Sequence, residues 1–139
     1  MAHYLHITKM AMLDLEKHAA ASFPLEAAAL LFGTISDNSI FVNRIEPMQN
    51  ESENKQTSFT INPEDQYRLL IKAEELGESL VGIFHSHPAP AYPSKRDQRN
   101  MRLNPVVWLV SSKTTGTWVT KAYILENDDV VSITIHVSE

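Results

Sequence analysis

The order of apolar and polar positions divides this chain into alternating stretches typical of strands and helices. Apolar runs at residues 25–32 and 80–84 predict two buried strands, and the second is expected to be covered on both faces. Gly33 is expected to close the first of them. Shorter or more weakly alternating stretches predict five further strands, at residues 4–7, 40–45, 106–110, 118–125 and 130–137.

Capping residues and apolar stripes predict three helices. Thr8 is placed to cap a helix that runs to about residue 21. Asn62 followed by Pro63 marks the start of a second helix, which Gly77 ends. A third helix is expected over residues 94–103. The buried stripe predicted for the second helix consists of Leu69, Leu70, Ala73 and Leu76.

These elements predict an α/β fold in which a mixed β-sheet is packed by helices. Residues 1–139 contain no internal repeat, low-complexity tract or inter-domain linker, so a single domain is expected. Residues 49–58 are polar and aperiodic, which predicts a flexible surface loop. The pattern leaves the order of the strands within the sheet open.

Composition and charge restrict the class of partner and of chemistry. The chain has 43% apolar residues and a formal charge of −5, and its basic residues are not clustered, so neither nucleic acid nor an anionic membrane is an expected partner. The longest apolar run is far too short to span a bilayer, and the first residues do not resemble a secretory signal. The absence of cysteine excludes disulfides and thiol chemistry and favours a cytoplasmic protein.

One short segment concentrates the residues that could carry chemistry. His85 and His87 lie two positions apart at the end of a predicted strand, so their side chains should project from one face while Ser86 points to the other. Zinc binds neutral imidazole nitrogens together with a carboxylate, and Asp97 is the nearest carboxylate downstream. Three protein ligands that leave one position open predict a hydrolytic zinc site.

Such a site needs a base, and Glu26 is the best candidate. It stands at the head of an apolar strand, where a carboxylate is unfavourable unless it has a specific partner. A purely structural role is also open to these residues, because Ser94 and Asp97 have the spacing of a helix capping box and Glu26 could face water at a strand end. Ordinary core or surface roles are expected for His3, His6, His18 and His136, and core positions are expected for Tyr67, Trp108 and Trp118.

Other zinc hydrolase patterns fit the sequence less well. No His-Glu-x-x-His helix is present, and the cysteine ligands of nucleobase deaminases are missing. The metallo-β-lactamase pattern requires Asp-His shortly after the second histidine, where this chain has Pro88 and Ala89. Barrel amidohydrolases also use a His-x-His pair, but 139 residues are too few for that barrel.

The combination of these residues resembles the signature of the JAMM (MPN+) metalloprotease family in its compact prokaryotic form. That signature is a glutamate on an early strand, then His-Ser/Thr-His-Pro and, after a short loop, Ser-x-x-Asp. The matching positions are Glu26, His85-Ser86-His87-Pro88 and Ser94-Lys95-Arg96-Asp97. The resemblance covers most of the chain and implies a JAMM/MPN fold of the cytidine-deaminase-like type.

The resemblance also implies a role for each matching residue. One Zn²⁺ per chain would be bound by His85, His87 and Asp97. Glu26 would be the general acid and base of the reaction, and Ser94 would stabilise the oxyanion. Two features depart from the family pattern: the loop from His87 to Asp97 is one residue shorter than usual, and Ala29 stands where many members carry glycine.

Members of that family hydrolyse the bond after the C-terminal Gly-Gly tail of ubiquitin-like or sulfur-carrier proteins. The resemblance therefore implies a zinc metalloprotease that acts as an isopeptidase or peptidase on such a tail. Two other functions stay open, namely a non-catalytic MPN-type interaction scaffold and a zinc amidase that acts on a small amide. The identity of the substrate and the oligomeric state have no signal in the sequence.

Overall fold

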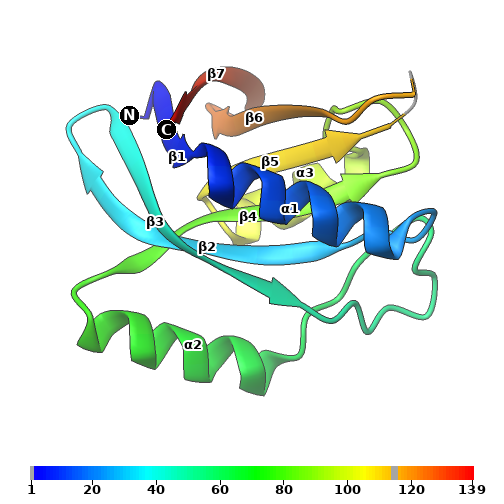
Figure 1. The fold of residues 1–139 in the computed structure, drawn as a ribbon, viewed down its shortest axis with the longest axis horizontal. Helices are drawn as coiled ribbons and strands as arrows, with labels where there is room; N and C mark the ends of the chain where they lie inside the picture. The colour runs from blue at the N-terminus through cyan, green and yellow to red at the C-terminus, as the bar shows by residue number, and fades with distance from the viewer. Residues whose placement is uncertain (1, 114–115) are drawn as a thin grey trace.

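The computed structural model describes residues 2–113 and 116–139, along which strands and helices alternate (Figure 1). The strands are β1 (Tyr4–Thr8), β2 (Ala28–Ser36), β3 (Ser39–Met48), β4 (Ser79–His87), β5 (Val107–Ser112), β6 (Val119–Glu126) and β7 (Asp129–Ser138). The helices are α1 (Lys9–Ser22), α2 (Pro63–Glu75) and α3 (Lys95–Leu103).

The strands form one sheet that closes into a barrel in the order β1–β3–β2–β4–β5–β6–β7. β1 closes the barrel by pairing in parallel with both β3 and β7. β4 and β5 are also parallel, whereas the remaining neighbours are antiparallel. The predicted mixed sheet is confirmed. The prediction of an ordinary sheet packed by helices is only partly right. β1 pairs with both β3 and β7, so among the described residues the sheet closes into a barrel and has no free edge strands.

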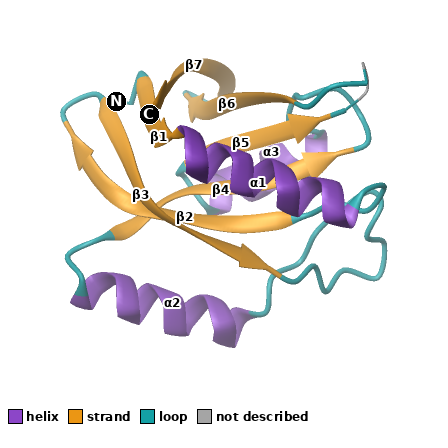
Figure 2. Cartoon of the chain, viewed as in Figure 1, coloured by secondary structure: helices purple, strands orange, loops and turns teal. Residues whose placement is uncertain are grey.

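Different helices cover the two faces of the sheet. α1 contributes Leu15 to one buried cluster, whereas α2 and α3 contribute Ala73 and Met101 to the other. Neighbouring side chains of β2 point to opposite faces, as expected for a strand. Leu31 packs in the cluster that contains Leu15, and Leu30 packs in the cluster that contains Ala73 and Met101. Figures 1 and 2 show α1 in front of β4 and β5, and α3 behind them. Burial on both faces explains the continuous apolar runs of β2 and β4.

The predicted elements are all present, with small differences at their ends. Thr8 caps α1 and Asn62 caps α2, each through a side-chain oxygen that accepts backbone N–H bonds from the first turn. The strand predicted from residue 25 begins at Ala28. The prediction that Leu76 is buried is wrong, because α2 ends at Glu75 and leaves the Leu76 side chain 59% exposed at the C-cap. The core position predicted for Tyr67 is also wrong, because this residue of α2 is 65% exposed.

Gly33 does not end β2, contrary to the prediction. The strand continues to Ser36 across an irregularity between Phe32 and Gly33, where its register against β3 shifts. A Cβ atom at position 33 would lie 1.8 Å from the carbonyl oxygen of Phe41 on β3. Glycine is therefore required here by the close approach of two backbones.

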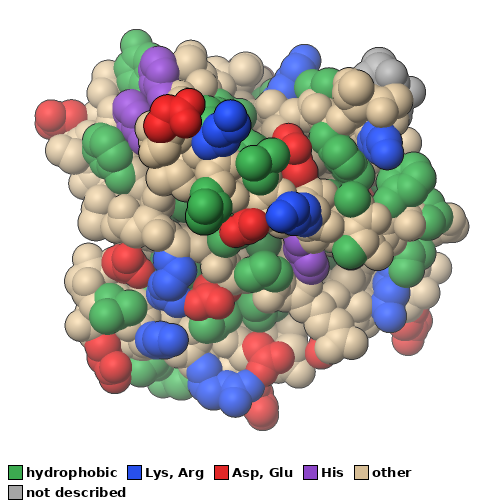
Figure 3. Space-filling model, viewed as in Figure 1, with side chains coloured by type: hydrophobic (Ala, Val, Ile, Leu, Met, Phe, Trp, Pro, Cys, Tyr) green, Lys and Arg blue, Asp and Glu red, His purple; other side chains and the backbone are tan. Residues whose placement is uncertain are grey.

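The face drawn in Figure 3 carries acidic and basic side chains in alternation, with no broad area of one sign. Along residues 2–113 and 116–139, none of the helices is long and apolar enough to cross a membrane. The expected absence of a nucleic-acid or membrane partner and the cytoplasmic location stay predictions.

Replacing Gly33 with alanine should destabilise the barrel. The added methyl group would force β2 and β3 apart, so Gly33→Ala is expected to lower the free energy of unfolding by about 3 kcal/mol. Urea unfolding followed by tryptophan fluorescence measures this change. The control is Thr34→Ala at the next, exposed position, which should change the same free energy by less than about 1 kcal/mol. Equal stability of the two variants would contradict the close approach of the strands.

Candidate metal centre

Strand pairing and helix placement bring the candidate residues to one end of the barrel. His85 and His87 are in the last three residues of β4, and His85 pairs with Ala28, the first residue of β2. Glu26 precedes Ala28 by two positions, so this pairing places it beside the histidines. Asp97 comes from the first turn of α3.

The alternation predicted for the His-Ser-His segment is confirmed. His85 and His87 both direct Nε2 to Asp97. The Ser86 hydroxyl instead accepts a hydrogen bond of 2.9 Å from the backbone N–H of Ala27. Because Ala27 directly follows Glu26, Ser86 joins the end of β4 to the segment that carries the glutamate.

Asp97 completes a capping box and also contacts both histidines. Ser94 Oγ accepts a hydrogen bond from the Asp97 N–H at 3.0 Å, and Asp97 Oδ2 accepts one from the Ser94 N–H at 2.8 Å. The same Oδ2 lies 3.1 Å from His85 Nε2 and 2.9 Å from His87 Nε2. The capping role and the contact with the histidines, which the sequence presents as alternatives, coexist in one side chain.

The shortened loop between β4 and α3 still delivers Asp97 to the histidines. Its carbonyl oxygens contact the site and the barrel: that of Pro90 lies 3.3 Å from His87 Nδ1, and that of Ala91 accepts a hydrogen bond from the Tyr123 hydroxyl at 2.5 Å. While Nδ1 donates to this carbonyl, a metal can replace the proton that Nε2 shares with Asp97. His87 is therefore oriented with Nε2 as its ligand atom.

Glu26 is a buried carboxylate that lacks a partner for one oxygen. Its exposed fraction is 3%, and Oε1 has no hydrogen-bond partner among the described residues. Burial raises the pKa of Glu26 to about 7, although the charge of nearby His87 acts in the opposite direction. An unsatisfied buried oxygen is unfavourable, so its place beside two histidines indicates a site for a ligand or water.

The pKa values of His85, His87 and Asp97 are also shifted from their usual values. Complete burial lowers the pKa of His85, which keeps this ring in its neutral, metal-binding form. For Asp97, burial alone would raise the pKa, but hydrogen bonds from His85 and His87 outweigh it and hold that pKa well below its usual range. For His87, burial acts to lower the pKa, but the hydrogen bond and charge of Asp97 raise it overall. Asp97 thus stays charged, whereas Glu26 can exchange a proton near neutral pH.

The donor set and its spacing fit a zinc ion. Two ligands of a tetrahedral zinc ion, each about 2.1 Å from the metal, lie about 3.4 Å apart. The observed distances of 2.9 and 3.1 Å from Asp97 Oδ2 to the two Nε2 atoms are only slightly shorter. Glu26 also offers a carboxylate oxygen within 4.8 Å of a ring nitrogen of each histidine. Two imidazoles with two carboxylates in reach are ligands that zinc prefers.

Aromatic packing around His85 was not predicted from the sequence. The ring centroid of Phe59 lies 5.0 Å from that of His85, and the centroid of Trp108 lies 5.7 Å away. Trp108 is buried as predicted, but it packs against a candidate ligand. His85 Nδ1 has no hydrogen-bond partner in the described part of the chain, so the His85 ring is oriented by these aromatic contacts together with the contact of Nε2 with Asp97. Phe59 lies just beyond the aperiodic segment of residues 49–58 and outside every predicted element, so no local signal in the sequence indicated this role.

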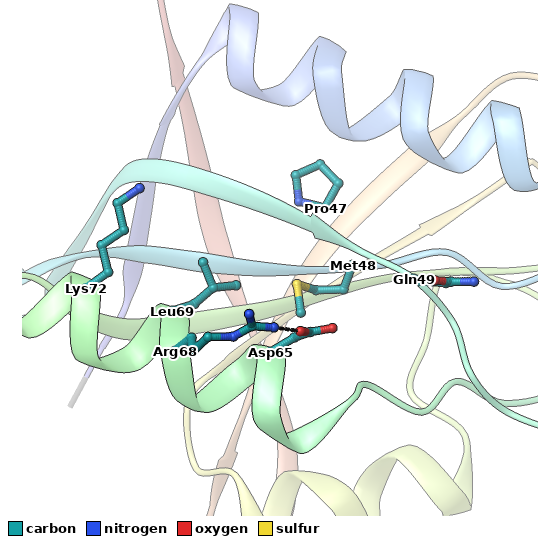
Figure 4. A pocket seen from close by; sticks show the side chains of 7 residues that line it. All are labelled: Pro47, Met48, Gln49, Asp65, Arg68, Leu69 and Lys72. Atoms are coloured by element: carbon teal, nitrogen blue, oxygen red, sulfur yellow. Dashed lines mark hydrogen bonds and ion pairs between the residues drawn. The ribbon is translucent and has the colours of Figure 1, made fainter.

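A hollow on the surface lies apart from these residues (Figure 4). It is formed by the end of β3 and by α2, and Figure 4 shows an ion pair between Arg68 and Asp65 at its rim. Its lining residues are Pro47, Met48, Gln49, Asp65, Arg68, Leu69 and Lys72. Met48 pairs with Ala28, which pairs with His85, so the hollow is two strands from the histidines.

The chain is similar to known proteins over most of its length. The family described as prokaryotic homologs of the JAB domain matches residues 9–122. A desampylase of Pyrococcus furiosus is 34% identical over 113 residues, which are 81% of this chain and 75% of that protein. A probable TtuB-protein conjugate cleaving protease of Thermus thermophilus is 27% identical over 132 residues, 94% of this chain and 82% of that protein. The solution structure of a Desulfitobacterium hafniense protein is 30% identical, with a TM-score of 0.85 over 97% of this chain and 93% of that one.

Burial of Glu26 predicts a pH-dependent stability in the metal-free protein. The pKa of Glu26 is raised from 4.5 to about 7 by folding, so its contribution to stability is complete below pH 4.5 and is lost as the pH rises through 7. Glu26→Gln stays neutral and should raise the Tm of chelator-treated protein by roughly 5 °C at pH 8, with little change at pH 4. Calorimetry at the two pH values measures this difference.

The matched control for this experiment is Glu53→Gln, at an exposed position of the loop between β3 and α2. Its Tm should follow that of the wild type at both pH values. An equal effect of Glu26→Gln at pH 4 and pH 8 would contradict the raised pKa of Glu26.

Proposed function

Because the chain belongs to the family of prokaryotic homologs of the JAB domain and is a JAMM-type hydrolase, we propose that it is a zinc-dependent isopeptidase. Its proposed substrate is a conjugate of a ubiquitin-like or sulfur-carrier protein, cut after the C-terminal Gly-Gly tail. The observation that carries the proposal is the convergence of His85 and His87 on one oxygen of Asp97. The names of the desampylase and the TtuB-conjugate protease support the substrate class.

We assign His85, His87 and Asp97 as the ligands of one zinc ion per chain, and Glu26 as the acid and base. The carboxylates of Asp97 and Glu26 both lie close to the histidines, so we distinguish the metal ligand from the acid and base by their charge states. Asp97 has a lowered pKa and remains an anionic ligand, whereas the pKa of Glu26 is about 7. A proton-transfer group works best with a pKa near the pH of the reaction.

In the proposed reaction, zinc and Glu26 have different roles. When bound, zinc supplies Lewis-acid charge to the scissile carbonyl and lowers the pKa of a bound water to about 7. Glu26 Oε1, which has no hydrogen-bond partner among the described residues, is available to accept a proton from the attacking water. Glu26 then donates that proton to the leaving amine, so a single carboxylate serves as base and acid in turn.

Ser94 is suited to stabilise the oxyanion that develops on the scissile carbonyl. Its Oγ accepts the Asp97 N–H, which leaves its own O–H free to donate, and the side chain is exposed. A donor held in place before the reaction stabilises developing charge without reorganisation. An extended Gly-Gly tail could in addition bind through main-chain hydrogen bonds, as an added strand does.

The test uses a ubiquitin-like protein joined by its C-terminal glycine to a lysine ε-amine of a reporter protein. Zinc-loaded wild-type protein should release the modifier with its Gly-Gly tail intact, as measured by mass spectrometry. Glu26→Gln should lower kcat by about a thousandfold, because it removes the proton-transfer group, while retaining its zinc. Glu53→Gln is the control and should cleave at the wild-type rate.

Other outcomes of this assay would point to the other functions. Full activity of a zinc-bound Glu26→Gln protein would contradict the role of Glu26. Turnover of small acyl-amides without cleavage of any conjugate would indicate an amidase. Zinc-free protein that binds the modifier without cutting it would indicate a scaffold.

A further inference from the structure

Asn50 is the centre of the hydrogen bonds in the loop between β3 and α2. Its Nδ2 donates to the backbone carbonyls of Glu26 at 2.9 Å and Ser58 at 3.0 Å. Its Oδ1 accepts from the backbone N–H groups of Ser52 at 3.0 Å and Thr60 at 3.1 Å. The side-chain amide thus uses both of its donors and both of its acceptor positions. This network lies in the surface loop predicted from the polar sequence, and the flexibility predicted for that loop stays a prediction.

The same loop binds both backbone polar groups of Glu26. The Glu26 N–H donates to the carbonyl of Lys55 at 2.7 Å, and the Glu26 carbonyl accepts from Asn50. Since β2 begins at Ala28, Glu26 lies outside the hydrogen-bond ladder of the sheet. The direction of its side chain therefore depends on the loop, because the loop sets the backbone from which that side chain projects.

The loop also reaches the histidines, through the ring of Phe59 against His85. Asn50 is linked to both Glu26 and Phe59. Its Nδ2 donates to the Glu26 carbonyl, and its Oδ1 accepts from the backbone N–H of Thr60, which directly follows Phe59. Aspartate would preserve the acceptor for Ser52 and Thr60 but could not donate to the Glu26 carbonyl. Asparagine is thus the residue whose donors and acceptors match all four partners.

We propose that Asn50 is a positioning residue, which holds the backbone of Glu26 so that its carboxylate faces His85 and His87. Asn50 itself need not touch the substrate or the metal. Its effect on catalysis rests on the proposed function, whereas its effect on the backbone of Glu26 does not. These two effects can be measured separately.

The test compares Asn50→Asp with Asn54→Asp in the zinc-loaded protein. Asn54 is an exposed residue of the same loop, and within the described part of the chain its hydrogen bonds are made by its backbone. Both variants add one negative charge to the loop, but Asn50→Asp alone removes the two donated bonds. Conjugate cleavage gives kcat and KM, elemental analysis gives zinc per chain, and hydrogen exchange followed by NMR reports on the Glu26 amide.

Asn50→Asp should lower kcat by roughly 10- to 100-fold, because a displacement of about 1 Å in a reacting group can have an effect of this size. KM and zinc content should stay within about twofold of the wild type, and exchange at the Glu26 amide should accelerate at least tenfold while the central strands stay protected. Asn54→Asp should match the wild type in all four measurements. Asn50→Ala adds no charge and should reproduce the loss of kcat. It replaces Asn50→Asp in the test if that variant fails to fold.

An unchanged kcat and an unchanged exchange rate at Glu26 would overturn the proposal. So would a loss of kcat that is fully explained by loss of zinc, because Asn50 would then act on the metal ligands. If the wild type cleaves no conjugate, the proposed function fails, and the exchange rate at Glu26 alone decides whether Asn50 holds this backbone.

Discussion

One carboxylate oxygen, Oδ2 of Asp97, connects the start of α3 to the end of β4. It accepts the backbone N–H of Ser94 and lies within 3.1 Å of the Nε2 atoms of His85 and His87. The capping box fixes the Asp97 side chain through backbone contacts of its own helix, so its orientation does not depend on a metal. A ligand held in place in this way has less conformational freedom to lose when an ion binds.

Glu26 also lies beside His85 and His87, but other parts of the chain position it. Its surroundings raise its pKa, whereas those of Asp97 lower the pKa of that residue. The pairing of β2 with β4 brings it to the histidines, but the loop that contains Asn50 holds its backbone. Burial without a partner for Oε1 raises its pKa to about 7, whereas the histidines lower that of Asp97. Such a buried carboxylate reduces the stability of the metal-free protein, a common trade-off at functional sites.

Local patterns predicted the parts of the site that depend on short distances along the chain. The side-chain period of a strand placed His85 and His87 on one face, and the capping box at Ser94 fixed the start of α3. Contacts between distant segments had no such signal: closure of the barrel by β1, the bulge at Gly33, and the packing of Phe59 on His85. The sequence also could not show that one aspartate both caps a helix and meets two histidines, because that depends on how the loop folds back.

The most direct test of the proposed metal centre is the amount of zinc per chain in wild type and Asp97→Ala, purified side by side without chelator. Asp128→Ala, which removes an exposed carboxylate paired with Arg102, is the control. A metal centre with Asp97 as a ligand predicts about one zinc ion per chain in the wild type and the control, and a small fraction of that in Asp97→Ala. Full zinc content in Asp97→Ala, or none in the wild type after zinc is added, would contradict a metal centre built on Asp97.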